Sequence, residues 1–335
     1  MSSAPTADEI ARDASWLAQA LDPAAGKLRL VAMDRNSYRA ASFLDDRMLQ
    51  QPVDAQLLPW PDVEAALGDG LRSDARWIFH IGHVGSTLVS RLLGELDDVL
   101  AIREPRLLRD LVLSPPEIRE RYVAAVPKLM SRTFARNEIA CVKATSLVSE
   151  IAAELVPPGE RALFMYATPC NYIANILAGP NSVKELRHLA VSRAERLGRH
   201  VAAIGPAHSD AELAAVAWAC DMTALEAAAA EMTKRRVEWA DFDQMLTDLP
   251  TALRRAAEHF GFRVDNAKLE AIISGPLTQR YSKALEYEYS PGLRRNRLGE
   301  AKRSHGRDIE CALAMLRSAA EKSPLLARAL SRAEG

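Results

Sequence analysis

Residues 77–93 combine the residue types that bind an anion: Trp-Ile-Phe-His-Ile-Gly-His-Val-Gly-Ser-Thr-Leu-Val-Ser-Arg-Leu-Leu. An apolar run leads through two glycines into an amphipathic stretch that begins with Ser86 and Thr87. A helix N-terminus presents unpaired N–H groups and partial positive charge, and glycine lets the backbone approach an anion closely. The segment therefore predicts a strand, a tight loop and a helix whose N-terminus binds nucleotide phosphates. An ordinary N-capped helix after a βα turn is the alternative.

The loop differs from the phosphate loop of kinases. That loop needs a lysine between its last glycine and the Ser/Thr, to reach the terminal phosphates. Here Gly85 is followed directly by Ser86, and the loop contains no lysine. An ATP-dependent kinase is therefore disfavoured.

Composition limits the function classes. The chain has 335 residues, 48% of them hydrophobic, which is enough for one large α/β domain or two small ones. A formal net charge of -1 argues against a globally basic nucleic-acid binder, so any anion site must be local. No apolar segment approaches the roughly 20 residues that span a bilayer, and we expect a cytoplasmic protein with no membrane partner. The four cysteines lack metal-ligand spacing, which predicts buried thiols and no metal site.

Short apolar runs alternate with helical patterns from residue 76 onwards. Strands are expected at residues 76–81, 139–142, 162–166 and 236–239, and helices at 86–96, 212–234 and 250–260. This rhythm predicts an α/β protein with a mostly parallel sheet covered by helices on both faces. Residues 1–75, with one short strand at 28–33, are expected to form an N-terminal cap, and residues 76–335 the α/β domain.

The loop resembles the sulfotransferase loop, which in bacterial and Golgi-type members runs Arg-Ser-Gly-Thr-Thr-Leu-Leu. Over it lie residues 83–89, with Gly85, Ser86 and Thr87 matching and His83 replacing a cation. The resemblance implies a divergent, bacterial-type sulfotransferase with a three-layer P-loop-type fold. It also implies the cofactor 3'-phosphoadenosine 5'-phosphosulfate (PAPS), whose 5'-phosphosulfate would be held by Gly82, His83, Val84, Gly85, Ser86 and Thr87.

Further matches follow in the family's order and cover residues 76–310. Residues 98–105 resemble a segment that ends a short strand with the general base of several sulfotransferases, which places that role on Glu104. Residues 140–145 resemble a strand end whose lysine faces the transferring sulfate, which places that role on Lys143. Residues 162–177 resemble the strand and helix that bind the 3'-phosphate, and residues 237–242 and 259–262 resemble the late strand and helix.

The departures from the family pattern fall on cofactor contacts. Ala167 stands where the family has the arginine that binds the 3'-phosphate, and Asn175 stands where it has a serine. Loss of the arginine should weaken recognition of PAPS unless another cation replaces it. Residues 279–307 combine Tyr281, Tyr287 and Tyr289 with many arginines, and the family usually closes over the 3'-phosphate with a late basic loop. The candidate replacements are Arg294, Arg295 and Arg297, with Lys184, Arg187 and Arg193 as further possible donors.

The resemblance implies transfer of a sulfuryl group from PAPS to an unknown hydroxyl or amine acceptor. Glu104 would take the acceptor's proton, while Lys143, the helix N-terminus and His83 would stabilise the developing charge. The alternative is a non-catalytic or differently liganded nucleotide- or anion-binding protein of the same fold. Each residue also has a simpler interpretation: Glu104 pairing with Arg103 or Arg106, Lys143 as a surface charge, and basic residues 294–297 as a solvated surface.

Overall fold

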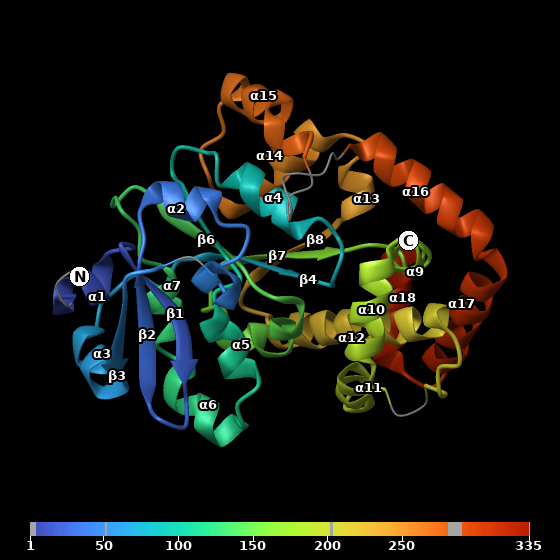
Figure 1. The fold of residues 1–335 in the computed structure, drawn as a ribbon, viewed down its shortest axis with the longest axis horizontal. Coiled ribbons are helices and arrows are strands. Elements are labelled where there is room, and N and C mark those ends of the chain that lie inside the picture. Colours follow the sequence, from blue (N-terminus) through green and yellow to red (C-terminus); the bar gives the residue numbers. More distant parts are fainter. Residues whose placement is uncertain (1–4, 51, 202–203, 281–289, 335) are drawn as a thin grey trace.

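The computed structural model describes residues 5–50, 52–201, 204–280 and 290–334. Its centre is a five-stranded sheet in the order β5-β6-β4-β7-β8, in which every pairing is parallel (Figure 1). The strands are β4 (Arg76–His80), β5 (Val99–Arg103), β6 (Ile139–Lys143), β7 (Arg161–Tyr166) and β8 (Arg236–Asp241). The predicted α/β class and parallel sheet are confirmed. All five strands therefore end at the same edge of the sheet.

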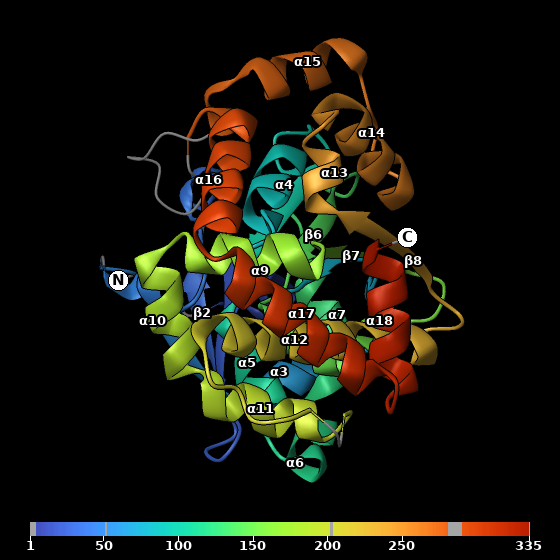
Figure 2. The same ribbon diagram turned by 90° about the vertical axis from the view of Figure 1, so that its right-hand side faces the viewer.

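Helices cover both faces of the sheet. On one face lie α4 (Ser86–Leu93) and α14 (Leu249–Phe260), and on the other lie α12 (Asp210–Glu231) and the 3-10 helix η2 (Ser146–Ile151) (Figures 1 and 2). Gly261 ends α14 in the left-handed conformation, with a φ of 74°. The result is the predicted three-layer arrangement.

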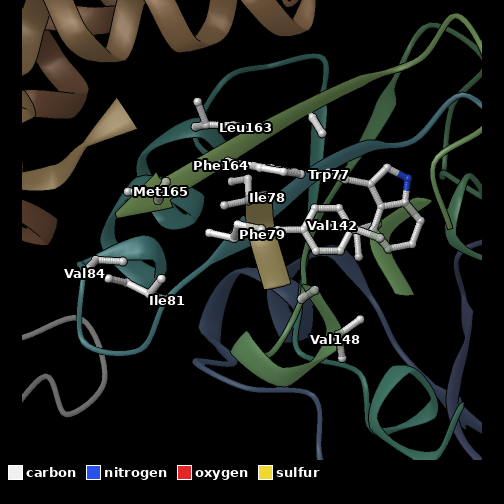
Figure 3. Close-up of a cluster of buried hydrophobic side chains, with 14 of the residues drawn as sticks. Trp77, Ile78, Phe79, Ile81, Val84, Val142, Val148, Leu163, Phe164 and Met165 are labelled. Atoms are coloured by element: carbon white, nitrogen blue, oxygen red, sulfur yellow. The ribbon is translucent and has the colours of Figure 1, made fainter. Parts of the chain in front are cut away.

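The core explains why the strands were recognisable. Figure 3 shows apolar side chains from three neighbouring strands packed together, among them Trp77, Phe79 and Phe164. The rings of Phe79 and Phe164 meet edge-on, with centroids 5.7 Å apart. Strands buried on both faces are continuously apolar, which is the pattern that the sequence presents.

The N-terminal part contains a second sheet. It is antiparallel, in the order β1-β2-β3, with β1 (Trp16–Asp22), β2 (Lys27–Ala32) and β3 (Ala55–Pro59). The sequence predicted β2 alone. Six of the seven β1 residues are buried, which removes the period-2 alternation, and β3 is a half-exposed edge strand that ends in proline. Around this sheet lie α1 (Ala7–Arg12), α2 (Arg35–Ala40), the 3-10 helix η1 (Asp46–Gln50) and α3 (Trp60–Ala66).

Buried arginines join the N-terminal part to the parallel sheet. Arg103, at the end of β5, donates to the carbonyls of Tyr38, Arg39 and Ala41, and Arg91 donates to the Ala40 carbonyl. Burial lowers the pKa of the Arg103 side chain, because the charged form is desolvated. Residues 38–41 are therefore held on the edge strand by charge-assisted hydrogen bonds.

The remaining helices surround the sheet and extend beyond α9 (Pro169–Leu177), where α17 and α18 pack against α12 (Figure 2). They are α5 (Arg106–Val112), α6 (Pro116–Val123), α7 (Val126–Met130), α8 (Ala152–Leu155), α10 (Pro180–His188), α11 (Ala190–Gly198), α13 (Phe242–Met245), α15 (Asn266–Ser274), η3 (Pro276–Thr278), α16 (Pro291–Ser304), α17 (Gly306–Ala320) and α18 (Pro324–Glu334). By length and composition α12 could cross a membrane, but 78% of its most apolar window is buried inside the protein. It is a core helix.

The cysteines divide into two classes. Cys141 and Cys220 are buried, as expected, and burial raises the pKa of both thiols to about 12. Cys170 is half-buried and Cys311, on α17, is exposed. The prediction of four buried thiols was therefore wrong for Cys311.

This difference predicts selective thiol labelling. A disulfide reagent attacks the thiolate, so at pH 8 Cys311 should react first, while Cys141 and Cys220 should react only after denaturation. Peptide mapping after timed labelling checks the order, with Cys311→Ser as the control that removes the fast site. Rapid labelling of Cys141 or Cys220 in the folded protein would contradict the burial described above.

Candidate functional site

The predicted anion-binding loop, residues 82–87 (called the anion loop below), lies at the centre of the sheet's carboxyl edge. It follows β4, which is flanked by β6 on one side and β7 on the other. The chain leaves β4 towards β5 at one end of the sheet, and later strands extend the sheet at the other end. Such a topological switch point is where open α/β sheets form their ligand crevice.

The loop has an unusual backbone. His83 has a φ of 61° and Gly85 a φ of 63°, so two residues within three are left-handed. Within the described residues, His83 and Glu104 are the non-glycine residues with positive φ. Both were predicted site residues. Left-handed backbone is unfavourable for such side chains, and it persists where the surrounding structure imposes it, often at functional sites.

Position 85 must be glycine because a side chain next to the edge strand β8 packs against it. A Cβ atom at residue 85 would lie 2.0 Å from Cζ of Phe242, which follows β8 directly. The Phe242 ring therefore occupies the space that any other residue would need. The sequence assigned no role to Phe242, although its position at a strand's carboxyl end was a usable signal.

The backbone of Gly82 is held from the opposite side, by a hydrogen bond to α12. Its N–H donates to Oδ2 of Asp221 at 3.2 Å, and Oδ1 of the same carboxylate lies 3.4 Å from Nη2 of Arg196. Asp221 is only 1% exposed. The sequence assigned no role to Asp221, although an acid within the apolar stretch of α12 was a signal. Together with Phe242, Asp221 makes the loop a preformed element.

Hydroxyl groups beside the loop remain available to a ligand. Ser86 and Thr87 begin α4 and are buried, and Oγ1 of Thr87 has no hydrogen-bond partner among the described residues. The same holds for the hydroxyl of Tyr172, which lies 3.7 Å from where a Cβ of residue 82 would stand. Buried polar atoms are normally satisfied, so unmet donors at a helix N-terminus fit an anion ligand.

His83 lies on the loop, and its ring has partners on the helices that follow β7. Nε2 lies 3.8 Å from Oε2 of Glu185, and the ring meets Tyr172 edge-on with centroids 6.5 Å apart. Asn175 donates to the His83 carbonyl at 3.3 Å. The structure thus places His83 and Asn175 together on the β7 side of the loop.

Glu104 and Lys143 meet on the other side of β4. Their side chains form an ion pair in which Lys143 is 1% and Glu104 is 9% exposed, and Oε2 of Glu104 lies 3.5 Å from Nη2 of Arg47. The Glu104 N–H also donates to the Lys143 carbonyl at 2.7 Å. Lys143 is therefore no surface charge. The pair sets a proton acceptor beside a positive charge.

The alternative interpretation, in which Glu104 pairs with Arg103 or Arg106, is also wrong. Arg103 donates to backbone carbonyls of residues 38–41, and Arg106 pairs with Asp46 and Asp110. Neither arginine forms an ion pair with Glu104 among those that the structure describes. The carboxylate turns towards β6 instead.

Arg294, on α16, contacts two residues that adjoin the loop, Asn175 and Phe242. Its Nε donates to Oδ1 of Asp243 at 2.7 Å and its Nη1 to Oδ1 of Asn175 at 3.2 Å, and its guanidinium lies 5.0 Å from the Phe242 ring centre. Nη2 is buried and has no hydrogen-bond partner within the described ranges. The structure therefore brings together Arg294 and Asn175, two residues that the sequence proposed separately for cofactor binding.

The neighbouring basic residues behave differently. The segment is a helix where a loop was expected, and Arg295 and Arg297 are exposed on it. Within the described residues, neither forms a hydrogen bond or an ion pair with residues 82–87. Lys184 is exposed, Arg187 pairs with Asp210, and Arg193 is buried with Nη2 4.0 Å from Oε1 of Glu185. Tyr281, Tyr287 and Tyr289 lie outside the described residues.

Ala167 is a position at which the site has no polar side chain to offer a ligand. It is fully buried, and its carbonyl accepts a hydrogen bond from Nε1 of Trp218 at 2.9 Å. The loop end of the site thus fits an anion, while residue 167 itself supplies no cation. The basic groups on this side come from α16, where Lys302 donates to Oδ1 of Asn171 at 2.6 Å and Arg294 to Oδ1 of Asn175 at 3.2 Å. Within the described ranges, no cluster of three or more His, Cys, Asp or Glu side chains could hold a metal ion.

The chain is similar to solved sulfotransferase structures. The sulfotransferase domain from the curacin biosynthetic pathway is 10% identical, with 67% of this chain and 86% of that domain covered and a TM-score of 0.41. The domain from the Synechococcus PCC 7002 olefin synthase is 13% identical, with 68% and 84% covered and a TM-score of 0.37. Mouse sulfotransferase SULT7A1, complexed with PAP, is 9% identical, with 78% and 89% covered and a TM-score of 0.37.

No family model and no curated protein matches the chain. At this level of similarity, the assignment of a function rests on the residues of the site.

The loop geometry predicts opposite results for its two glycines. Gly85→Ala meets the Phe242 ring and adds a side chain at positive φ, which alone costs about 1–2 kcal/mol. It should lower the free energy of unfolding by more than that amount. Gly82→Ala has no contact closer than 3.7 Å and should be nearly neutral. Urea denaturation of both variants checks this, and equal stabilities would contradict the described packing.

Proposed function

We propose that this protein transfers a sulfuryl group from PAPS to a hydroxyl or amine acceptor. The observation that carries the proposal is the buried Glu104–Lys143 pair, which ends two adjacent strands beside the anion loop. A general base and a cation for charge stabilisation are the two groups that this transfer needs.

The residues of the loop suit the 5'-phosphosulfate end of the cofactor. The N–H groups at the start of α4, together with the hydroxyls of Ser86 and Thr87, would hold it, and Gly85 lets the backbone come close. On the β7 side, Arg294 and Asn175 would face the 3'-phosphate end. When bound, PAPS would supply an activated sulfuryl group whose bond to the 5'-phosphate breaks as sulfur bonds to the acceptor.

The chain's own residues then have distinct tasks. Glu104 accepts the proton that the acceptor hydroxyl or amine loses as it attacks. Lys143 and the N–H groups of α4 stabilise the negative charge that develops on the sulfuryl and bridging oxygens. The ring of His83 lies on the β7 side of the loop. His83 would help to stabilise the developing negative charge through this ring and through its backbone.

A second function is favoured by a specific observation. Arg294 shares its charge with Asp243, and Ala167 supplies no cation, so the site could bind a nucleotide or another anion without transferring sulfate. Calorimetry with adenosine 3',5'-bisphosphate, ATP, AMP and sulfate separates the two proposals. No binding of the bisphosphate at millimolar concentration would contradict sulfuryl transfer, and a magnesium-dependent preference for ATP would indicate a kinase.

The general-base role predicts a separation of rate from binding. Glu104→Gln should lower the turnover number for sulfuryl transfer by about 10²- to 10⁴-fold, because the amide cannot accept the proton. Affinity for adenosine 3',5'-bisphosphate should stay within about threefold. Glu310→Gln, on the exposed face of α17, is the control. Full turnover by the Glu104 variant would exclude the role.

The position of Arg294 predicts selectivity for a 3'-phosphate. Arg294→Met should weaken binding of adenosine 3',5'-bisphosphate by about tenfold and leave AMP nearly unchanged, because a charge-assisted hydrogen bond to the extra phosphate is lost. Arg297→Met, on the same helix but exposed, is the matched control. Equal losses for both nucleotides would show that Arg294 supports the loop and does not contact the 3'-phosphate.

A further inference from the structure

A cavity lies at the opposite edge of the sheet from the loop. It has a volume of about 430 Å³ and is lined by α1, by residues 70–72 ahead of β4, and by residues 131–136 ahead of β6. The anion loop follows the other end of β4. At about 3.3 Å per residue, that strand alone separates the two places by more than about 13 Å. The cavity is therefore distinct from the site described above, and its volume suits a small molecule.

The lining of this cavity is strongly basic. Five cationic side chains face two acidic ones, Asp8 and Asp13. The cations are Arg12, Arg72, Lys128, Arg132 and Arg136.

Among the described residues, ion pairs compensate two of the five cations. Arg12 pairs with Asp8 at 3.1 Å, and Arg72 pairs with Asp74 at 3.0 Å. Nζ of Lys128 donates to the carbonyls of Leu67 and Gly68. Among the described residues, neither Lys128 nor Arg136 forms an ion pair. Positive charge is therefore in excess.

Arg132 is the buried cation among the five that line the cavity. It is 5% exposed, its Nε donates to the Leu129 carbonyl at 2.8 Å, and its Nη1 donates to the Ile10 carbonyl at 3.0 Å. Nη2 makes no hydrogen bond with a described residue, and no carboxylate in that part of the chain lies within 4.0 Å of the guanidinium. Asp13, the acid that faces it, accepts the Ser15 N–H. A buried guanidinium without an adjacent anion is costly, and one in a cavity is poised to bind an anion.

The cavity also has an apolar side. Leu71 and Phe134 line it, and the Phe134 ring is held in place by Tyr38, with ring centroids 5.9 Å apart, and by Arg35, whose guanidinium lies 4.9 Å from the ring centre. A ligand with an apolar body would cover this surface.

We propose that this cavity binds a small organic anion, with its carboxylate or phosphate head on Arg132 and Arg136 and its apolar body against Leu71 and Phe134. The class of ligand follows from the cationic and apolar halves of the lining. The proposal does not depend on the function of the anion loop.

Titration calorimetry with phenyl phosphate and benzoate tests the proposal and distinguishes the two head groups. At least one probe should bind, and phenol, which has the same body without the anion, should bind at least tenfold more weakly. Arg136→Ala should weaken binding by about tenfold, as should Arg132→Met; the Arg136 side chain is exposed and forms no ion pair among the described residues. Arg317→Ala, exposed on α17, and Thr87→Val, at the anion loop, should leave it unchanged.

Three results would overturn the proposal. The first is full affinity in the Arg136→Ala variant, which does not depend on whether the Arg132 variant folds. The second is loss of affinity in the Thr87→Val variant alone, because the probe would then occupy the loop and not this cavity. The third is failure of both probes to bind at millimolar concentration.

Discussion

The packing of Phe242 against Gly85 is the constraint on which the candidate site depends. The chain must turn from β4 into α4 within five residues, and the ring occupies the volume beside the left-handed residue of that turn. Because Phe242 follows β8, the edge strand of the sheet determines the shape of a loop at its centre. Asp221 holds the Gly82 amide from the other face. The amides at the start of α4 are thus oriented before any ligand arrives, and preorganised donors stabilise charge without a reorganisation cost.

The Glu104–Lys143 pair is difficult to explain by stability alone. Both side chains are more than nine-tenths buried, and Glu104 adopts a φ of 53°. Removing two charges from water costs several kcal/mol, and apolar residues of similar volume are often at least as stabilising as such a pair. Left-handed backbone at a glutamate adds a further cost. An arrangement that is expensive in two independent ways, beside a preformed anion loop, is better explained by chemistry than by folding.

The sequence predicted the features that depend on short segments. Strands β4, β6 and β7 were recognisable as apolar runs, and β8 as a shorter segment around Val237 and Trp239. The loop was recognisable by its glycines and hydroxyls, and Glu104 and Lys143 by their positions at strand ends. Features set by distant contacts were missed. Phe242 lies 157 positions from Gly85 and Asp221 lies 139 from Gly82, so no local pattern joins them. Strand β1 was missed because burial on both faces removes its alternation, and Cys311 because composition does not show which side of a helix faces water.

The balance of charge around Arg294 shapes what the β7 side of the site can recognise. Nε is engaged by Asp243 and Nη1 by Asn175, so Nη2 is the donor left for a ligand within the described residues. The Asp243 carboxylate cancels most of the guanidinium's net charge while leaving its hydrogen-bonding geometry intact. A phosphate here would gain a directed hydrogen bond but would also lie near a negative charge. Under the proposed function, selectivity for a 3'-phosphate would therefore depend on the direction of the Nη2 donor of Arg294 more than on the net charge of its guanidinium.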